Sequence, residues 1–109
     1  MRAAIRVAPP AGQQALLDEW LAQAGGDGRA IVAESGFVPL EAPPHVPLAR
    51  LAPGCVCCVG QLPLRVTLAR LVRAHRPQAI LLLLASDDHL PRLRALLADG
   101  SLGVRFELE

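Results

Sequence analysis

The sequence predicts a three-layer α/β domain with a mainly parallel sheet, and three observations lead to this prediction. The run QAILLLLAS, residues 78–86, is apolar without alternation, as in a strand buried on both faces of a parallel sheet. Strand-like runs and helical patterns follow each other in the order β-α-β-loop-β-α-β-α-β. The length of 109 residues suits one domain with one modest core, so we expect a single domain over residues 1–109.

The first half of the chain predicts a strand, a helix and a second strand. AAIRVA, residues 3–8, is a short apolar strand that the PPAG turn ends. QQALLDEWLAQA, residues 13–24, has the apolar spacing of a helix, and the glycines of GGDG follow it. RAIVAES, residues 29–35, predicts the second strand, and the prolines in residues 36–47 predict a loop. The residues that share one face of the first helix are Leu16, Leu17, Trp20, Leu21 and Ala24.

The second half predicts a weak strand at residues 46–52 and then two helices around the buried strand. QLPLRVTLARLVRAH, residues 61–75, tolerates its proline in the first helical turn. DDHLPRLRALLADG, residues 87–100, predicts a short helix with an acidic first turn and Gly100 as terminator. GVRFELE, residues 103–109, predicts the final strand. The core-facing residues of the longer helix are Leu64, Leu68, Leu71 and Val72.

Composition and charge argue against several classes of partner. The longest uninterrupted apolar run, residues 79–85, is too short to span a bilayer, so we expect no membrane partner. A net charge of +1 and an aromatic content of 3% give no reason to expect nucleic acid. The amino-terminal residues lack the apolar stretch of a secretory signal, which predicts a cytoplasmic protein. The high apolar content, 52%, makes a protein partner or a homodimer plausible.

All three cysteines lie in one short stretch, APGCVCCVG, within a predicted cysteine loop at residues 53–60. An odd number of thiols in one loop does not indicate a disulfide framework. The loop leads into a predicted helix N-terminus, which favours the thiolate form that binds metals. Cys55, Cys57 and Cys58 are therefore candidates for metal binding or for reactive thiols.

The stretch PGCVCCVGQLPLRVTLARLVRAHRPQAILL resembles the CobW-type metal-chaperone GTPases, whose motif is Gly-Cys-x-Cys-Cys followed by a helix and an RPD-like turn. Upstream, AIVAESGFVPLE is similar to the family's Asn-Glu-x-Gly segment, which aligns Glu34 with its glutamate. The resemblance implies a P-loop-NTPase-like fold, similar to the amino-terminal domain of the family. It also implies a zinc or other transition-metal site formed by Cys55, Cys57, Cys58 and Glu34.

The nucleotide motifs of that family are missing here. The phosphate-binding loop GxxGxGKT corresponds to the degenerate segment of residues 8–15, in which Gln13 and Gln14 replace the lysine and the threonine. The chain contains neither lysine nor asparagine, so the guanine-reading NKxD motif cannot exist. Since catalysis by P-loop enzymes depends on positioning and charge at the phosphates, we predict no GTP binding and no GTPase activity.

These observations leave three functional hypotheses. The first is a non-hydrolytic CobW-like accessory module that binds a metal through the GCVCC loop. His45 is then either a fourth ligand or an ordinary surface histidine. The second is a pseudo-GTPase interaction domain that docks on a partner without metal or nucleotide chemistry. The third is a thiol redox module that uses Cys55 and Cys58 as a C-x-x-C pair. Ser35 and Ser86 lack the histidine and carboxylate context of a hydrolase.

Overall fold

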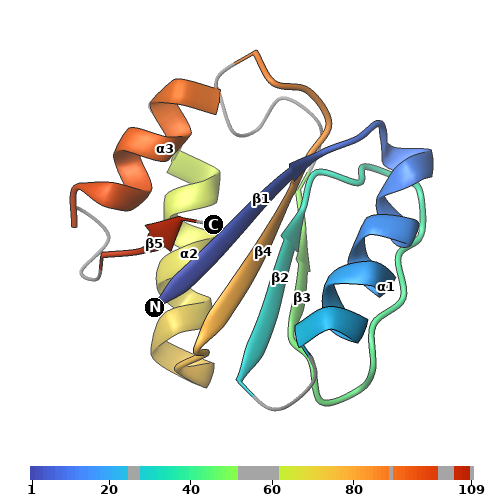
Figure 1. The fold of residues 1–109 in the computed structure, drawn as a ribbon, viewed down its shortest axis with the longest axis horizontal. Coiled ribbons are helices and arrows are strands. Elements are labelled where there is room, and N and C mark those ends of the chain that lie inside the picture. Colours follow the sequence, from blue (N-terminus) through green and yellow to red (C-terminus); the bar gives the residue numbers. More distant parts are fainter. Residues whose placement is uncertain (25–27, 52–61, 89, 101–104, 109) are drawn as a thin grey trace.

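The computed structural model describes residues 1–24, 28–51, 62–88, 90–100 and 105–108, and arranges them in three layers (Figure 1). The element order agrees with the sequence prediction. The strands are β1 (Arg2–Val7), β2 (Arg29–Ala33), β3 (Leu48–Arg50), β4 (Ala79–Leu84) and β5 (Glu107–Leu108). The helices are a short 3-10 helix η1 (Pro10–Gly12) and the α-helices α1 (Gln13–Ala24), α2 (Leu62–His75) and α3 (Leu90–Ala98).

The strands form one sheet in the order β3-β2-β4-β1-β5, and every neighbouring pair is parallel. β4 lies at the centre, where Ala79 pairs with Arg2 of β1 on one side and with Arg29 of β2 on the other. All six residues of β4 are buried, as its unbroken apolar run predicts. The predicted mainly parallel α/β class is therefore confirmed.

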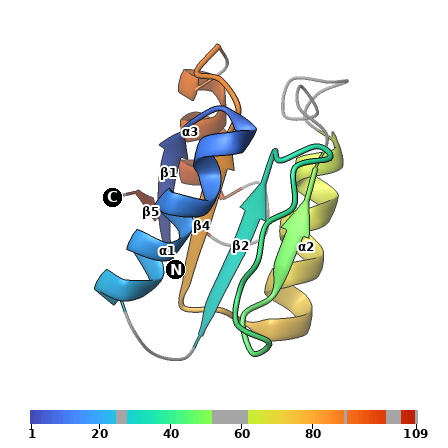
Figure 2. The same cartoon turned by 90° about the vertical axis from the view of Figure 1, so that its right-hand side faces the viewer.

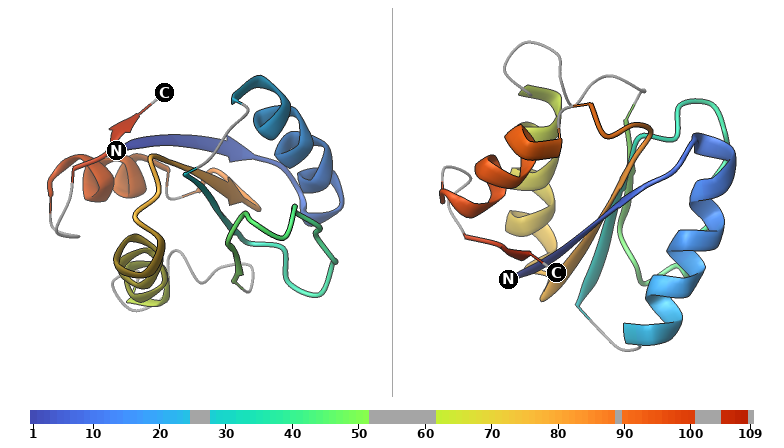
Figure 3. Two further views of the ribbon diagram at one scale, coloured as in Figure 1. Left: turned by 90° about the horizontal axis from the view of Figure 1, so that it is seen from below. Right: turned by 45° about the horizontal axis from the view of Figure 1, so that its top comes forward.

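The two faces of the sheet are covered by different helices, α1 on one face and α2 with α3 on the other (Figures 1 and 3). Alternate residues of β4 serve the two layers. Leu81 and Leu83 belong to the cluster around Leu17 and Trp20 of α1, whereas the even-numbered residues belong to the α2–α3 cluster. The even-numbered group and its main helical partners are Ile80, Leu82, Leu84, Leu64, Leu68, Leu93 and Leu96.

The predicted apolar faces of the two longer helices are largely confirmed. In α1, Leu17 and Trp20 are buried, while Leu16 and Leu21 pack against the same cluster at its edge. The side chain of Ala24 lies outside the described part of the chain. In α2 the buried residues are Leu64, Leu68 and Leu71, with Val72 partly buried.

α3 begins three residues later than the sequence predicts, so its expected acidic first turn is wrong. Asp87 and Asp88 lie in the turn before the helix, and the backbone N–H of Leu90 donates to the Asp87 carbonyl oxygen at 3.2 Å. Just after β4 the backbone N–H of Ala85 donates to Oε1 of Glu34 at 3.0 Å, and Pro91 suits the first turn of a helix that starts at Leu90. Gly100 ends the helix with φ of 79°, as predicted.

The proline loop, residues 36–47, leaves the end of β2 and runs back along the molecule to the start of β3 (Figure 2). Leu40 and Val46 bury their side chains in the α1 layer. Gln14 fixes the middle of the loop because its side-chain amide accepts from the backbone N–H of Glu41 at 2.8 Å and donates to the Glu41 carbonyl oxygen at 2.9 Å. Only the first residues of this loop lie at the carboxyl edge of the sheet.

Candidate functional site at the carboxyl edge of the sheet

Three polar residues in the described part of the chain are buried, and all three lie where β1 and β2 end. Gln13, Glu34 and Ser35 are 0%, 5% and 0% exposed. The carboxyl ends of parallel strands meet at one edge, where α/β proteins commonly place ligand sites. Buried polar groups need hydrogen-bond partners, so their contacts define how this edge is built.

Glu34 follows the last residue of β2 and connects that strand to the end of β4. Its backbone N–H donates to the carbonyl oxygen of Leu83 at 2.8 Å. Its side-chain Oε1 accepts from the backbone N–H of Ala85 at 3.0 Å. The carboxylate is thus buried and oriented at the sheet edge, in the position where the sequence predicts a metal ligand.

Gln13 is the first residue of α1 and connects the loop after β1 to the end of β2. Its Nε2 donates to the carbonyl oxygens of Ala8 at 3.1 Å and Glu34 at 3.2 Å. Its Oε1 is buried and has no hydrogen-bond partner among the residues that the structure describes. At the position that the resemblance aligns with the phosphate-binding lysine, the side chain therefore bonds to the protein's own backbone.

The loop after β1 has a compact local structure. Pro10 to Gly12 form η1, in which the Gly12 N–H donates to the Pro9 carbonyl oxygen at 2.8 Å. Among the described residues, a Cβ atom built on Gly12 would meet the Cβ of Ala8 alone, at an ordinary contact distance of 3.6 Å. Nothing in the backbone of this loop requires glycine at position 12.

The three cysteines lie outside the described residues, so their predicted arrangement as metal ligands stays a prediction. The chain that leads to them is placed beside Glu34. Leu51 donates its backbone N–H to the Ala33 carbonyl oxygen at 2.8 Å and accepts from the Gly36 N–H at 3.3 Å. These two bonds lie on either side of Glu34 in the sequence. Within the described residues, no group of three or more His, Cys, Asp or Glu side chains lies close enough to hold a metal.

The histidines do not join this cluster in the described structure. His45 is exposed in the proline loop just before β3, toward the amino ends of the strands, so its predicted alternative role as a fourth ligand gains no support. His75 is exposed in the last turn of α2, as predicted for a helix C-terminus. His89 lies outside the described residues. Ser86 donates to Asp88 at 3.3 Å, and Ser35 accepts from Arg50 at 3.0 Å.

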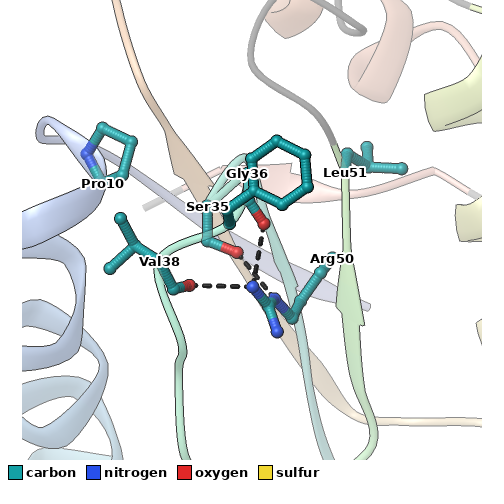
Figure 4. Close-up of a pocket in the computed structure, with 7 residues that line it drawn as sticks. Pro10, Ser35, Gly36, Val38, Arg50 and Leu51 are labelled. Carbon is teal, nitrogen blue, oxygen red and sulfur yellow. Dashed lines mark hydrogen bonds between the residues drawn. The ribbon is translucent and has the colours of Figure 1, made fainter.

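An open pocket of about 640 Å³ adjoins this edge, and sequence reasoning missed it. Figure 4 shows Pro10 and Val38 on one side, Leu51 on the other, and Arg50 reaching from β3 toward Ser35 and Gly36. The pattern that could have indicated it is the apolar pair Phe37–Val38 inside a proline-rich loop. That pair has no periodicity, so only the fold brings it next to Arg50.

Comparisons with family models, with curated proteins and with solved structures found no match to this chain. The structure shows the parallel α/β architecture, and the resemblance to CobW-type proteins stays a prediction from the sequence motifs. Among the described residues, none of the helices combines the length and the apolar character that a membrane span requires.

Proposed function

We propose that this chain is a CobW-like module that binds zinc or another transition metal and does not hydrolyse GTP. Cys55, Cys57, Cys58 and Glu34 are the proposed donors. The observation that supports the proposal is the position of Glu34, whose buried carboxylate lies at the carboxyl edge of the sheet while the backbone of Leu51 bonds to Ala33 and Gly36 on either side of it. The first cysteine follows Leu51 by only four residues, about 14 Å of fully extended chain.

The chemistry of the donor set fits zinc. Zinc prefers tetrahedral coordination by thiolates, imidazoles and carboxylates, and three thiols with one carboxylate complete such a set. A ligating carboxylate is normally oriented by a hydrogen bond from outside the metal's own shell, and the Ala85 N–H supplies one to Glu34. The proposed site therefore has both a donor set and an orienting contact.

Residues at the same carboxyl edge of the sheet support the proposal that the protein has no GTPase activity. The order of the sheet places β1 beside β4, and β1 leads through η1 into α1, which is compatible with a P-loop-NTPase-like fold. However, the Gln13 side chain donates its hydrogen bonds to backbone carbonyl oxygens. The chain also has no lysine that could compensate the charge of a phosphate. We infer a binding module without nucleotide chemistry.

Zinc titration of the reduced protein tests the proposal. We expect one equivalent of zinc, and a thiolate charge-transfer band when cobalt(II) replaces it. Cys57→Ser/Cys58→Ser should abolish both signals. Glu34→Gln should weaken zinc about tenfold or more, since the amide can still accept from Ala85 N–H but brings no charge.

The matched control is Glu41→Gln, because Glu41 is an exposed carboxylate in the proline loop. It should leave the zinc affinity unchanged. Equal zinc binding by the wild type and the double cysteine variant would remove the metal proposal.

The second candidate is an interaction domain that docks on an acidic partner protein. The exposed surface of α2 favours it, because Arg70, Arg73 and Arg76 are exposed there and at its C-terminal end, and Val66 is 40% exposed. If this candidate is right, the purified protein holds no zinc. A partner is first isolated by its retention on the wild-type protein. Replacing Arg70 and Arg73 by glutamate should then abolish that complex.

A further inference from the structure

The pocket at the carboxyl edge combines a fixed cation with apolar walls. Its walls are formed by Pro10 of η1, Phe37 and Val38 of the proline loop, and Leu51 after β3. Its polar groups include Arg50 and Ser35. A volume of about 640 Å³ lies within the range of small-molecule sites, which are mostly apolar with a few placed polar groups.

Within the described part of the chain, Arg50 is held in place by neutral acceptors. Its Nε donates to Ser35 Oγ at 3.0 Å, and its Nη2 donates to the carbonyl oxygens of Gly36 at 2.8 Å and Val38 at 2.9 Å (Figure 4). Among the described residues, neither a carboxylate partner nor a hydrogen bond of Nη1 occurs for this side chain. Its charge is therefore oriented but not neutralised, and Nη1 retains two N–H groups for an anion.

Phe37 gives the pocket an apolar wall that no described part of the protein covers. Its side chain is fully exposed, whereas Trp20 and Phe106, the other two aromatic residues, are each 5% exposed. Val38 is 36% exposed beside it. An exposed aromatic residue next to an oriented cation provides apolar contact for a ligand whose head group meets the arginine.

We propose that this pocket binds a small organic monocarboxylate with an apolar hydrocarbon body. The carboxylate accepts from Nη1 of Arg50, and the hydrocarbon lies against Phe37, Val38 and Leu51. An inorganic anion gains nothing from these apolar walls, and a neutral hydrocarbon leaves the arginine without a partner. Arg50 and Phe37 are not among the proposed metal donors, so the two proposals are tested by different variants.

Titration of the ¹⁵N-labelled protein with octanoate, 1-octanol and acetate tests the proposal. We expect octanoate to shift the backbone amides of residues 35–38 and 51 with a Kd of about 1 mM or tighter. 1-Octanol should bind about tenfold more weakly, because it has no charge to pair with Arg50. Acetate should cause no saturable shift. Equal affinities for octanoate and 1-octanol, or no saturable octanoate binding, would overturn the assignment.

A matched pair of variants at Phe37 isolates the electrostatic contribution to the octanoate affinity without disturbing the fold. Phe37→Gln and Phe37→Glu differ by one charge at a side chain that is fully exposed. Both should lose apolar contact equally, but only Phe37→Glu should weaken octanoate by a further factor of about three while leaving 1-octanol unchanged. Val66→Glu, at an exposed position on α2, is the control and should leave both affinities unchanged.

Arg50→Gln should reduce octanoate affinity about tenfold, to that of 1-octanol. The Cys57→Ser/Cys58→Ser variant should bind octanoate as the wild type does, so failure of the metal proposal and failure of this one are separate results. Undiminished octanoate binding by Arg50→Gln, with its amide spectrum otherwise preserved, contradicts the role of the arginine.

Discussion

Gln13 is fully buried and donates from one amide nitrogen to two backbone carbonyl oxygens, those of Ala8 and Glu34. It thereby ties the loop after β1 to the end of β2. A glutamine at the start of a helix is ordinarily a surface residue, so its neighbours in the sequence give no sign of this role. Its importance at this position is structural, whatever the function of the site.

Replacing that donor by an acceptor is therefore expected to destabilise the fold. Gln13→Glu keeps the size of the side chain but places carboxylate oxygens against two carbonyl oxygens, and should cost about 3 kcal/mol of the free energy of unfolding. Gln23→Glu, on the exposed surface of the same helix, should cost at most about 0.5 kcal/mol through repulsion from Glu19. Urea denaturation measures both. Equal effects would show that the buried contacts of Gln13 contribute little.

The two glycines Gly28 and Gly12 differ in whether the local backbone requires a glycine. Gly28 has φ of 78°, and a Cβ there would lie 3.2 Å from Cγ of Gln78, so Gly28→Ala should lower the free energy of unfolding by about 1–2 kcal/mol. Gly12 has room for a methyl group, and Gly12→Ala should change stability by less than about 0.5 kcal/mol and leave zinc affinity unchanged. A large loss of stability in Gly12→Ala would contradict the described loop.

At the scale of elements, α2 is attached to the sheet by a narrow apolar stripe. Leu68 is fully buried against the strands, while Val66, half a turn away, is 40% exposed. Leu68→Ala should cost about 3 kcal/mol because it leaves a cavity between α2 and the sheet. Val66→Ala should cost less than about 0.5 kcal/mol. Thermal unfolding followed by circular dichroism distinguishes the two, and similar melting temperatures would place α2 outside the core.

Most elements were predictable because their patterns are local. The unbroken apolar run of β4 and the spacing of Leu64, Leu68 and Leu71 each report burial directly. The start of α3 was not predictable from the sequence, because the turn before it depends on contacts that form at the sheet edge only after folding. The residues of the candidate site were likewise only partly predictable from the sequence. The family resemblance of a motif singled out Glu34 as a proposed donor, whereas Arg50 and Phe37 become neighbours only through the parallel pairing of β2 and β3.

At the scale of the whole molecule, a metal that binds only the folded protein should stabilise the entire domain. Free zinc at 100 times its Kd should add about 2.7 kcal/mol, which raises Tm by at least about 10 °C in a domain of this size. Cys57→Ser/Cys58→Ser should show no rise, and GTP with Mg²⁺ should have no effect on either protein. Differential scanning fluorimetry measures all of these. A rise in Tm with GTP and Mg²⁺ would contradict the proposed loss of nucleotide binding.

The position of β1 between β4 and β5 affects the order in which the chain can fold. Its residues pair with partners roughly 77 and 105 positions further along, as in Arg2 with Ala79 and Glu107. During synthesis β1 has no hydrogen-bonding neighbour until β4, about 77 positions further along, has been made. Such distant closures slow folding, since loop entropy is lost before the contacts form. We therefore expect β1 to stay unpaired, and accessible to chaperones, while the segment between β1 and β4 is synthesised.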